Sequence, residues 1–183
     1  MKLVPRKVVP FVGQAGQDLA LAALLGGNLF GRLAMHPALS DIGDESERGK
    51  VLNRAWRRYG NVNSVALAAL VGGWVSVRRD ETGVLWTRPV RRRLILTKDG
   101  AVGAVVVTGL ASAVGGVSFA AQAPQGAVPL ASGRDPGADT PARAARLKRL
   151  VNVLGGLNLG AEVTLVTVNV LLARRSADRR WPG

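Results

Sequence analysis

The run AVGAVVVTGLASAVGGVSFAA (101–121) contains no charged residue and lies inside a longer uncharged stretch, 100–133. An α-helix of about 20 apolar residues is long enough to cross the hydrocarbon core of a bilayer. We therefore predict a membrane-spanning helix over residues 100–121. The segment 97–99, Thr-Lys-Asp, is typical of a helix N-cap followed by an acidic first turn, so we expect the helix to begin there.

Three further stretches have the same character. Residues 59–77 carry no charge, residues 150–173 carry only Glu162, and residues 8–35 carry two charges. We place the four spans at about 11–36, 60–77, 100–121 and 150–173. Together they predict an all-α fold, a polytopic integral membrane protein whose 183 residues form a single four-transmembrane-helix bundle.

Composition excludes several classes of site. The chain has no cysteine and one histidine, which leaves no disulfide framework, thiolate metal site or histidine-rich metal cluster. Aromatic residues make up 4% of the chain, too few for a base-stacking platform. We expect no metal or other cofactor and no nucleic-acid partner, although the net charge is +13.

The basic residues predict the orientation. Fourteen Lys and Arg residues lie in the two termini and the second loop, against ten in the other two loops. Cytoplasmic segments carry the excess of such residues, so we expect a multi-pass protein of the cell membrane with both termini in the cytoplasm. The densest basic cluster should bind anionic lipid headgroups at the cytoplasmic face. Its members are Arg88, Arg91, Arg92 and Arg93.

Two segments between the spans have distinct patterns. Residues 44–59 place acidic residues before basic ones and repeat apolar residues at helical spacing, which predicts an interfacial amphipathic helix between spans one and two. Trp56 and Tyr59 would anchor it at headgroup depth. Residues 122–145 are rich in Pro and Gly and predict a flexible extramembrane loop.

Polar residues inside the spans are the candidate functional residues, because ionisable groups are costly at membrane depth. Glu162 lies near the middle of span four and shares a helix face with Asn158. Asn28, Arg32 and His36 share a face of span one through their spacing of four. Asn28, Asn63 and Asn158 fall at similar depth when counted from the span centres, about 1.5 Å per residue. We therefore predict a polar pocket in the outer half of the bundle. Its members are Asn28, Arg32, His36, Asn63, Asn158 and Glu162.

This pocket supports two main hypotheses. In the first, the protein binds or transforms a lipophilic small molecule, with Glu162 as acid, base or hydrogen-bond donor and Arg32 as its charge partner. In the second, the protein is a non-enzymatic accessory or structural subunit, in a homo- or hetero-oligomer, whose polar residues only specify helix packing. A third hypothesis, proton-coupled transport through Glu162, lacks the internal repeats typical of transporters. The sequence leaves open whether the protein is an enzyme.

Several short motifs in the first half of the chain carry a family resemblance. They are Gly-Gly-Asn-Leu-Phe-Gly (26–31), His36-Pro37 at the end of span one, and Asn-Arg-Ala-Trp (53–56) before Asn61 and Asn63. In residues 20–77 the chain resembles the anthrone-oxygenase-like group of small four-span membrane proteins. The resemblance implies a four-helix architecture with asparagine and histidine in a polar interior. Some members of that group are implicated in cofactor-free oxidation of polycyclic phenols.

Overall fold

The structure is a computed structural model that describes residues 8–81 and 89–177. That part of the chain is helical and contains no β-strand. Four long α-helices carry the fold: α1 (Val8–Phe30), α3 (Glu45–Glu81), α4 (Pro89–Ala120) and α5 (Ala142–Ala177). Short helical turns follow α1, and a single 3-10 turn, η4 (Pro124–Gly126), lies in the loop between α4 and α5.

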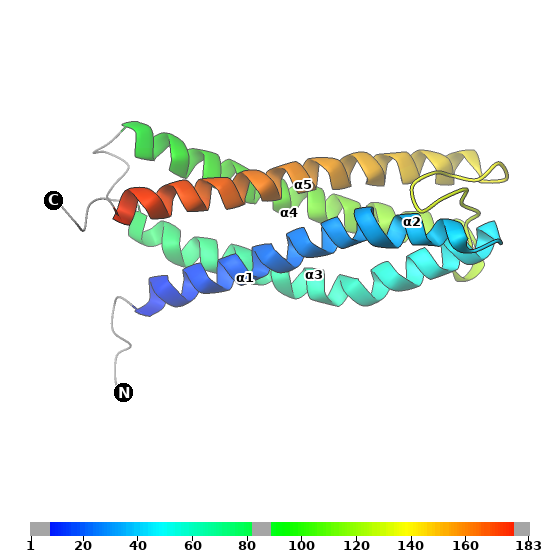
Figure 1. The fold of residues 1–183 in the computed structure, drawn as a ribbon, viewed down its shortest axis with the longest axis horizontal. Coiled ribbons are helices and arrows are strands. Elements are labelled where there is room, and N and C mark those ends of the chain that lie inside the picture. The colour runs from blue at the N-terminus through cyan, green and yellow to red at the C-terminus, as the bar shows by residue number, and fades with distance from the viewer. Residues whose placement is uncertain (1–7, 82–88, 178–183) are drawn as a thin grey trace.

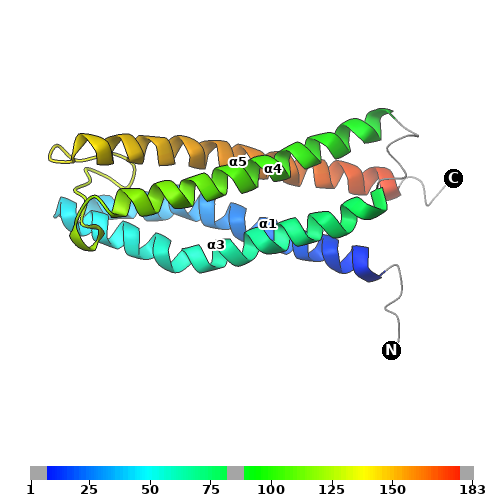
Figure 2. The ribbon, with the colours of Figure 1, turned by 180° about the vertical axis from the view of Figure 1, so that it is seen from behind.

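The four helices form an elongated bundle of two pairs. α1 packs mainly against α3 and α4 mainly against α5, and the pairs meet where α1 contacts α5 and α3 contacts α4. Figures 1 and 2 show the two pairs side by side from opposite directions. The beginning of α1 and the end of α5 lie at one end of the bundle, which we call the terminal end. The loop 121–141 lies at the other, the loop end.

All four helices are long and apolar enough to cross a membrane. The qualifying segments are Phe11–Asp41, Glu45–Arg79, Pro89–Ala120 and Ala142–Arg174. The all-helical, four-helix prediction is confirmed at this level. Many large apolar side chains point away from the bundle, including Leu33 at 75% exposure and Val117 at 73%. Outward apolar faces of this kind suit contact with lipid chains.

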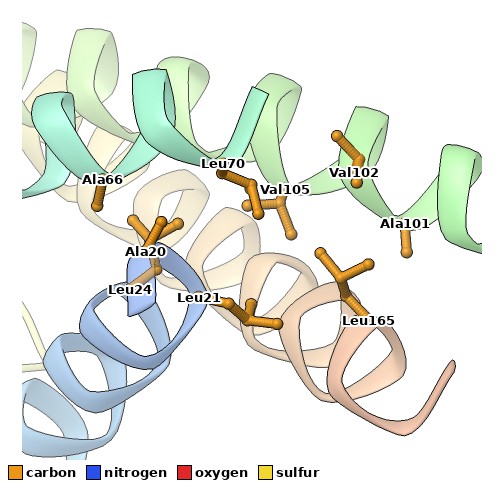
Figure 3. Close-up of a cluster of buried hydrophobic side chains, with 9 residues drawn as sticks. All are labelled: Ala20, Leu21, Leu24, Ala66, Leu70, Ala101, Val102, Val105 and Leu165. Atoms are coloured by element: carbon orange, nitrogen blue, oxygen red, sulfur yellow. The ribbon is translucent and has the colours of Figure 1, made fainter. Parts of the chain in front are cut away.

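Apolar side chains also fill the interior in two clusters. The first lies where the two pairs meet and combines side chains from all four long helices, which Figure 3 shows pointing toward one another. Its members are Ala20, Leu21, Leu24, Ala66, Leu70, Ala101, Val102, Val105 and Leu165. The second cluster lies at the loop end and includes Leu52, Phe119 and Leu130. The long helices are therefore packed along most of their length.

The helix bounds differ from the sequence prediction at α1 and α4. After Phe30 the chain continues as a π-helical turn (Gly31–Met35), α2 (His36–Ala38) and the 3-10 turn η2 (Leu39–Asp41). A proline inside a helix lacks the N–H and crowds the preceding turn, and here the wider π turn precedes Pro37 so that helical structure passes through it. α4 begins at Pro89 rather than near residue 97, which is consistent with the preference for proline in the first turn.

The predicted amphipathic helix is present and continues directly into the second predicted span, while its position at a membrane interface stays a prediction. Residues 45–59 form the first part of α3, which is one continuous helix to Glu81. Leu52 is buried in the loop-end cluster. Trp56 and Tyr59 pack against α1, where a Cβ atom on Gly31 or Gly27 would overlap their rings. The Tyr59 hydroxyl donates to the Ala23 carbonyl at 2.7 Å. The two aromatic side chains therefore join helices, which the headgroup-anchor prediction did not anticipate.

The segment expected to be a flexible loop is held in place by the bundle. Val128 and Leu130 are fully buried. Side chains from α3 and α5 donate hydrogen bonds to its carbonyl groups: Arg48 to Leu130 and Ala131, Asn53 to Gly126, and Lys148 to Gly133. Turn-forming residues thus build a defined cover over the loop end, because distant side chains satisfy the loop carbonyls.

Candidate functional site

Glu162 is fully buried near the middle of α5. It belongs to the inward stripe of that helix, together with Asn158, Leu165 and Val168, which are all buried. Spacings of three and four residues place these side chains on one face of the helix. The same periodicity that buries two apolar side chains of α5 therefore also buries a carboxyl group and an amide.

Asn28 of α1 binds Glu162 from the opposite side. Its side-chain nitrogen Nδ2 donates to Glu162 Oε1 at 2.9 Å and to Oε2 at 3.0 Å. The same nitrogen lies 2.9 Å from Asn158 Oδ1. The sequence prediction that these three residues meet is in agreement with the structure, and their contacts join α1 to α5.

Asn158 extends the network to α4. Its Nδ2 donates to the Val105 carbonyl at 2.9 Å and to Thr108 Oγ1 at 2.8 Å. The Thr108 hydroxyl in turn donates to the Ala104 carbonyl at 2.6 Å. Asn28, Thr108, Asn158 and Glu162 therefore form one hydrogen-bonded group across three helices, which we call the Glu162 cluster.

The Glu162 carboxyl accepts few hydrogen bonds for a group that is fully buried. In the described residues, the Asn28 amide is the only group that donates to it. That amide has two hydrogens and faces three acceptor oxygens, whereas a carboxylate has about four acceptor positions. A buried carboxylate with so few donors is poorly solvated, and its remaining positions are able to accept a hydroxyl or N–H group.

Arg32, the predicted charge partner of Glu162, makes no direct ion pair with it. Its Nη2 donates instead to the Asn152 carbonyl at 3.4 Å, and the guanidinium lies over Gly155. No ion pair joins Arg32 to Glu162, both of which lie in the described part of the chain. Arg32 is one turn closer to the loop end than Asn28, so its long side chain reaches the α5 backbone first. The charge of Glu162 still acts on Arg32 over the longer distance.

Asn63 and His36 also lie apart from the Glu162 cluster. Asn63 is half-buried on α3 and makes no hydrogen bond to Asn28, Asn158 or Glu162. The depth of Asn63 along the bundle did not predict its contacts, because the Glu162 cluster is built from α1, α4 and α5 and Asn63 lies on α3. His36 lies at the loop end, where its ring packs against Trp56 with centroids 6.3 Å apart.

Thr108 is the member of the cluster that was not predicted from the sequence. It is one of the few polar residues in the apolar stretch 101–121, and that rarity was the available signal. The predicted headgroup cluster divides between two parts of the chain. Arg91, Arg92 and Arg93 lie in the first turns of α4 at the terminal end, whereas Arg88 is outside the described residues.

A groove on the neighbouring face of α1 is not lined by Glu162. It lies between α1 and α3, has a volume of about 320 Å³ and is lined mainly by apolar side chains, including Phe30, Trp56 and Val62. Its α1 wall contains Gly27 and Gly31, which face α3, while Asn28 faces α5. A ligand in this groove would therefore not contact Glu162, and a ligand of Glu162 has to use the acceptor positions that Asn28 leaves free.

Comparison with known proteins gives no match: no family model, curated protein or solved structure matches the chain. The resemblance of residues 20–77 to the anthrone-oxygenase-like group stays a prediction. Function is therefore inferred from the geometry of the Glu162 cluster and of the bundle around it.

Proposed function

We propose that this chain is a multi-pass protein of the cell membrane that binds a lipophilic small molecule at Glu162, with both termini in the cytoplasm. The observation that carries the proposal is the Glu162 carboxyl, which is fully buried yet accepts hydrogen bonds from only the Asn28 amide among the described residues. Ionisable groups at membrane depth are costly and usually functional. A carboxyl with free acceptor positions suits a ligand that carries a hydroxyl or N–H group.

In this proposal each residue of the cluster has a distinct part. Glu162 accepts the ligand's hydrogen bond, and in a catalysed reaction it takes or returns a proton. Asn28 and Asn158 orient the carboxyl and the ligand. Arg32 supplies positive charge from one turn away rather than through direct pairing. Oxidation of a phenolic substrate is the chemistry that the family resemblance adds.

The test is mass spectrometry of small molecules that co-purify with the detergent-extracted protein. Glu162→Gln keeps the size of the side chain and removes the carboxyl. We expect a discrete compound, distinct from bulk phospholipid, with the wild type and its loss with Glu162→Gln. Thr164→Val is the matched control, because Thr164 is exposed two residues further along α5 and its hydroxyl bonds only to its own helix at Gly160. It should retain the compound.

The second candidate function is structural, and the contacts of Asn158 favour it. Its oxygen accepts from Asn28, and its amide hydrogens go to Val105 and Thr108, so the side chain is fully used in joining helices. Interhelical polar contacts of this kind specify packing without further function. Recovery of bulk lipid only, from wild type and Glu162→Gln alike, with a change in thermal stability, would establish this role and reject ligand binding.

A further inference from the structure

Four basic side chains converge at the loop end of the bundle, away from the Glu162 cluster. Lys148 of α5 donates from Nζ to the Gly133 carbonyl at 2.6 Å. The backbone of Gly133 lies against His36 so closely that a Cβ atom on Gly133 would overlap the His36 backbone. Gly133 therefore sits between Lys148 and His36, and Arg134 follows it directly in the loop.

Asn152 of α5 contacts the other two basic residues, Arg134 and Arg32. Its Nδ2 donates to the Arg134 carbonyl at 2.8 Å, and its own carbonyl accepts from Arg32 Nη2 at 3.4 Å. The basic group thus draws side chains from α5, from the turns that follow α1 and from the loop. We call it the loop-end basic cluster, and its members are Arg32, His36, Arg134 and Lys148.

The burial of two members indicates a missing partner. Lys148 is 4% exposed, and its ammonium, which has three donors, makes one hydrogen bond, to the Gly133 carbonyl, and lies over the Phe119 ring at 5.8 Å from the centroid. In the described residues no carboxylate forms an ion pair with it. Both ring nitrogens of His36 are buried and have no hydrogen-bond partner among residues 8–81 and 89–177. Buried polar atoms are nearly always paired, and an imidazole N–H that is not paired calls for an acceptor.

The charge at this place is strongly one-sided. Arg32, Arg134 and Lys148 all act electrostatically on His36. Two acids border the cluster: Asp135 acts on Lys148 while its carboxylate accepts from Ser132, and Glu162 acts on Arg32. Neither acid forms an ion pair with a member of the cluster. Placing like charges together costs free energy, which a bound anion would offset.

We propose that the loop-end basic cluster is a binding site for an anionic group, a phosphate or a carboxylate. Lys148 and Arg32 provide the charge from the bundle side, and His36 supplies an N–H donor. Arg134 is exposed at the end of the bundle, so an anion that approaches from there meets it first. Guanidinium groups match the geometry of such anions through paired donors. The proposal does not depend on ligand binding at Glu162.

The first test uses inorganic phosphate and the detergent-purified protein at low ionic strength, with binding measured by calorimetry. Arg134→Ala keeps the backbone groups that anchor the loop and should weaken phosphate binding about tenfold, as expected for one charged hydrogen bond. Arg149→Ala is the matched control, because it removes one positive charge from an exposed neighbour of Lys148. It should leave the affinity within about twofold.

A second arm distinguishes the source of the anion. The protein is placed in phosphatidylcholine nanodiscs with or without phosphatidylglycerol, and its thermal stability is measured. Stabilisation by phosphatidylglycerol that Arg134→Ala removes identifies a lipid headgroup. Phosphate binding without that stabilisation identifies a soluble anion. Arg134→Ala should retain the small molecule that co-purifies with the wild type, which separates this site from the proposed function.

Two results would overturn the proposal. One is the absence of both phosphate binding and phosphatidylglycerol stabilisation in the wild type. The other is an equal loss of affinity in Arg134→Ala and Arg149→Ala, which would show a general effect of surface charge. Lys148→Met adds a buried variant, and its loss of phosphate binding counts in favour only where circular dichroism shows the wild-type helix content.

Discussion

The side-chain amide of Asn28 lies between the two carboxyl oxygens of Glu162, at 2.9 and 3.0 Å, and joins residues 134 positions apart in the chain. The same nitrogen contacts Asn158 Oδ1. One amide therefore satisfies acceptors on two successive turns of α5. The contact helps to fix the position of α1 against α5, together with the hydrogen bond from Asn169 to Asp18 nearer the terminal end.

Removing the Asn28 amide should show how much this contact contributes to stability. Asn28→Ala leaves the Glu162 carboxyl and the Asn158 oxygen without this donor, and we expect the free energy of unfolding to fall by about 1–3 kcal/mol. Replacing both partners should cost less than the sum of the single changes, since Asn28→Ala with Glu162→Leu leaves no buried carboxyl to satisfy. Unfolding by denaturing detergent measures all three variants. Strictly additive costs would show that the contact is energetically unimportant.

The Asn158 contacts to α4 give a second prediction. Asn158→Leu removes both donors to Val105 and Thr108 and should lower the free energy of unfolding by about 0.6–2 kcal/mol. Asn61→Leu is the matched control, because Asn61 is exposed on α3 and should show little change. The same denaturation assay compares them. Equal stability of the two variants would mean that α4 and α5 are held together by apolar packing alone.

The number of long apolar helices could be predicted because uncharged stretches of membrane length are rare and stand out against a basic chain. The bounds of the helices were harder to predict from the sequence. Residues 91–93, three consecutive arginines, were assigned to a loop, yet they lie in the first turns of α4, and Asp99 accepts from Trp74 and Arg78 inside the bundle. Charges at the end of an apolar stretch therefore do not stop a helix.

Part of the candidate site could also be predicted. Helical periodicity and depth were enough to bring Asn28, Asn158 and Glu162 together. They failed for Asn63 and for the direction of Arg32, because depth says nothing about the rotation of a helix or the reach of a long side chain. The packing of the loop against the bundle could not be predicted for a similar reason. The side chains that donate to its carbonyl groups, such as Arg48 and Lys148, lie outside the loop in the sequence.

Close contact between α1 and α3 leads to a third prediction. A Cβ atom on Gly27 would overlap the Tyr59 ring, so Gly27→Ala should cost about 1–3 kcal/mol of stability through overpacking. Gly116→Ala is the matched control, because no atom outside its own turn lies within 4 Å of a Cβ there. Because alanine has a higher helix propensity than glycine, Gly116→Ala should leave the stability unchanged or raise it by up to about 1 kcal/mol. Thermal aggregation midpoints in detergent test the order of the two variants, and a reversed order would contradict the close packing of α1 against α3.

Topology gives the last prediction, and the absence of native cysteines makes it simple to test. Val90 lies near the start of α4 at the terminal end, and Asp139 is exposed in the loop at the opposite end. In intact cells a membrane-impermeant maleimide should label Asp139→Cys, whereas Val90→Cys should react only after the membrane is opened.

Val107→Cys is the control for the membrane itself. Val107 is 66% exposed on the bundle surface, yet it lies in the middle of α4. There the surrounding hydrocarbon should keep its thiol from forming the reactive thiolate. Labelling of positions 90 and 139 from the same side would reject four spans, and exchange of the two sides would reject only the orientation. Ready labelling of position 107 in intact membranes would show that the outward apolar face is covered by water rather than by lipid, and membrane insertion itself would then be wrong.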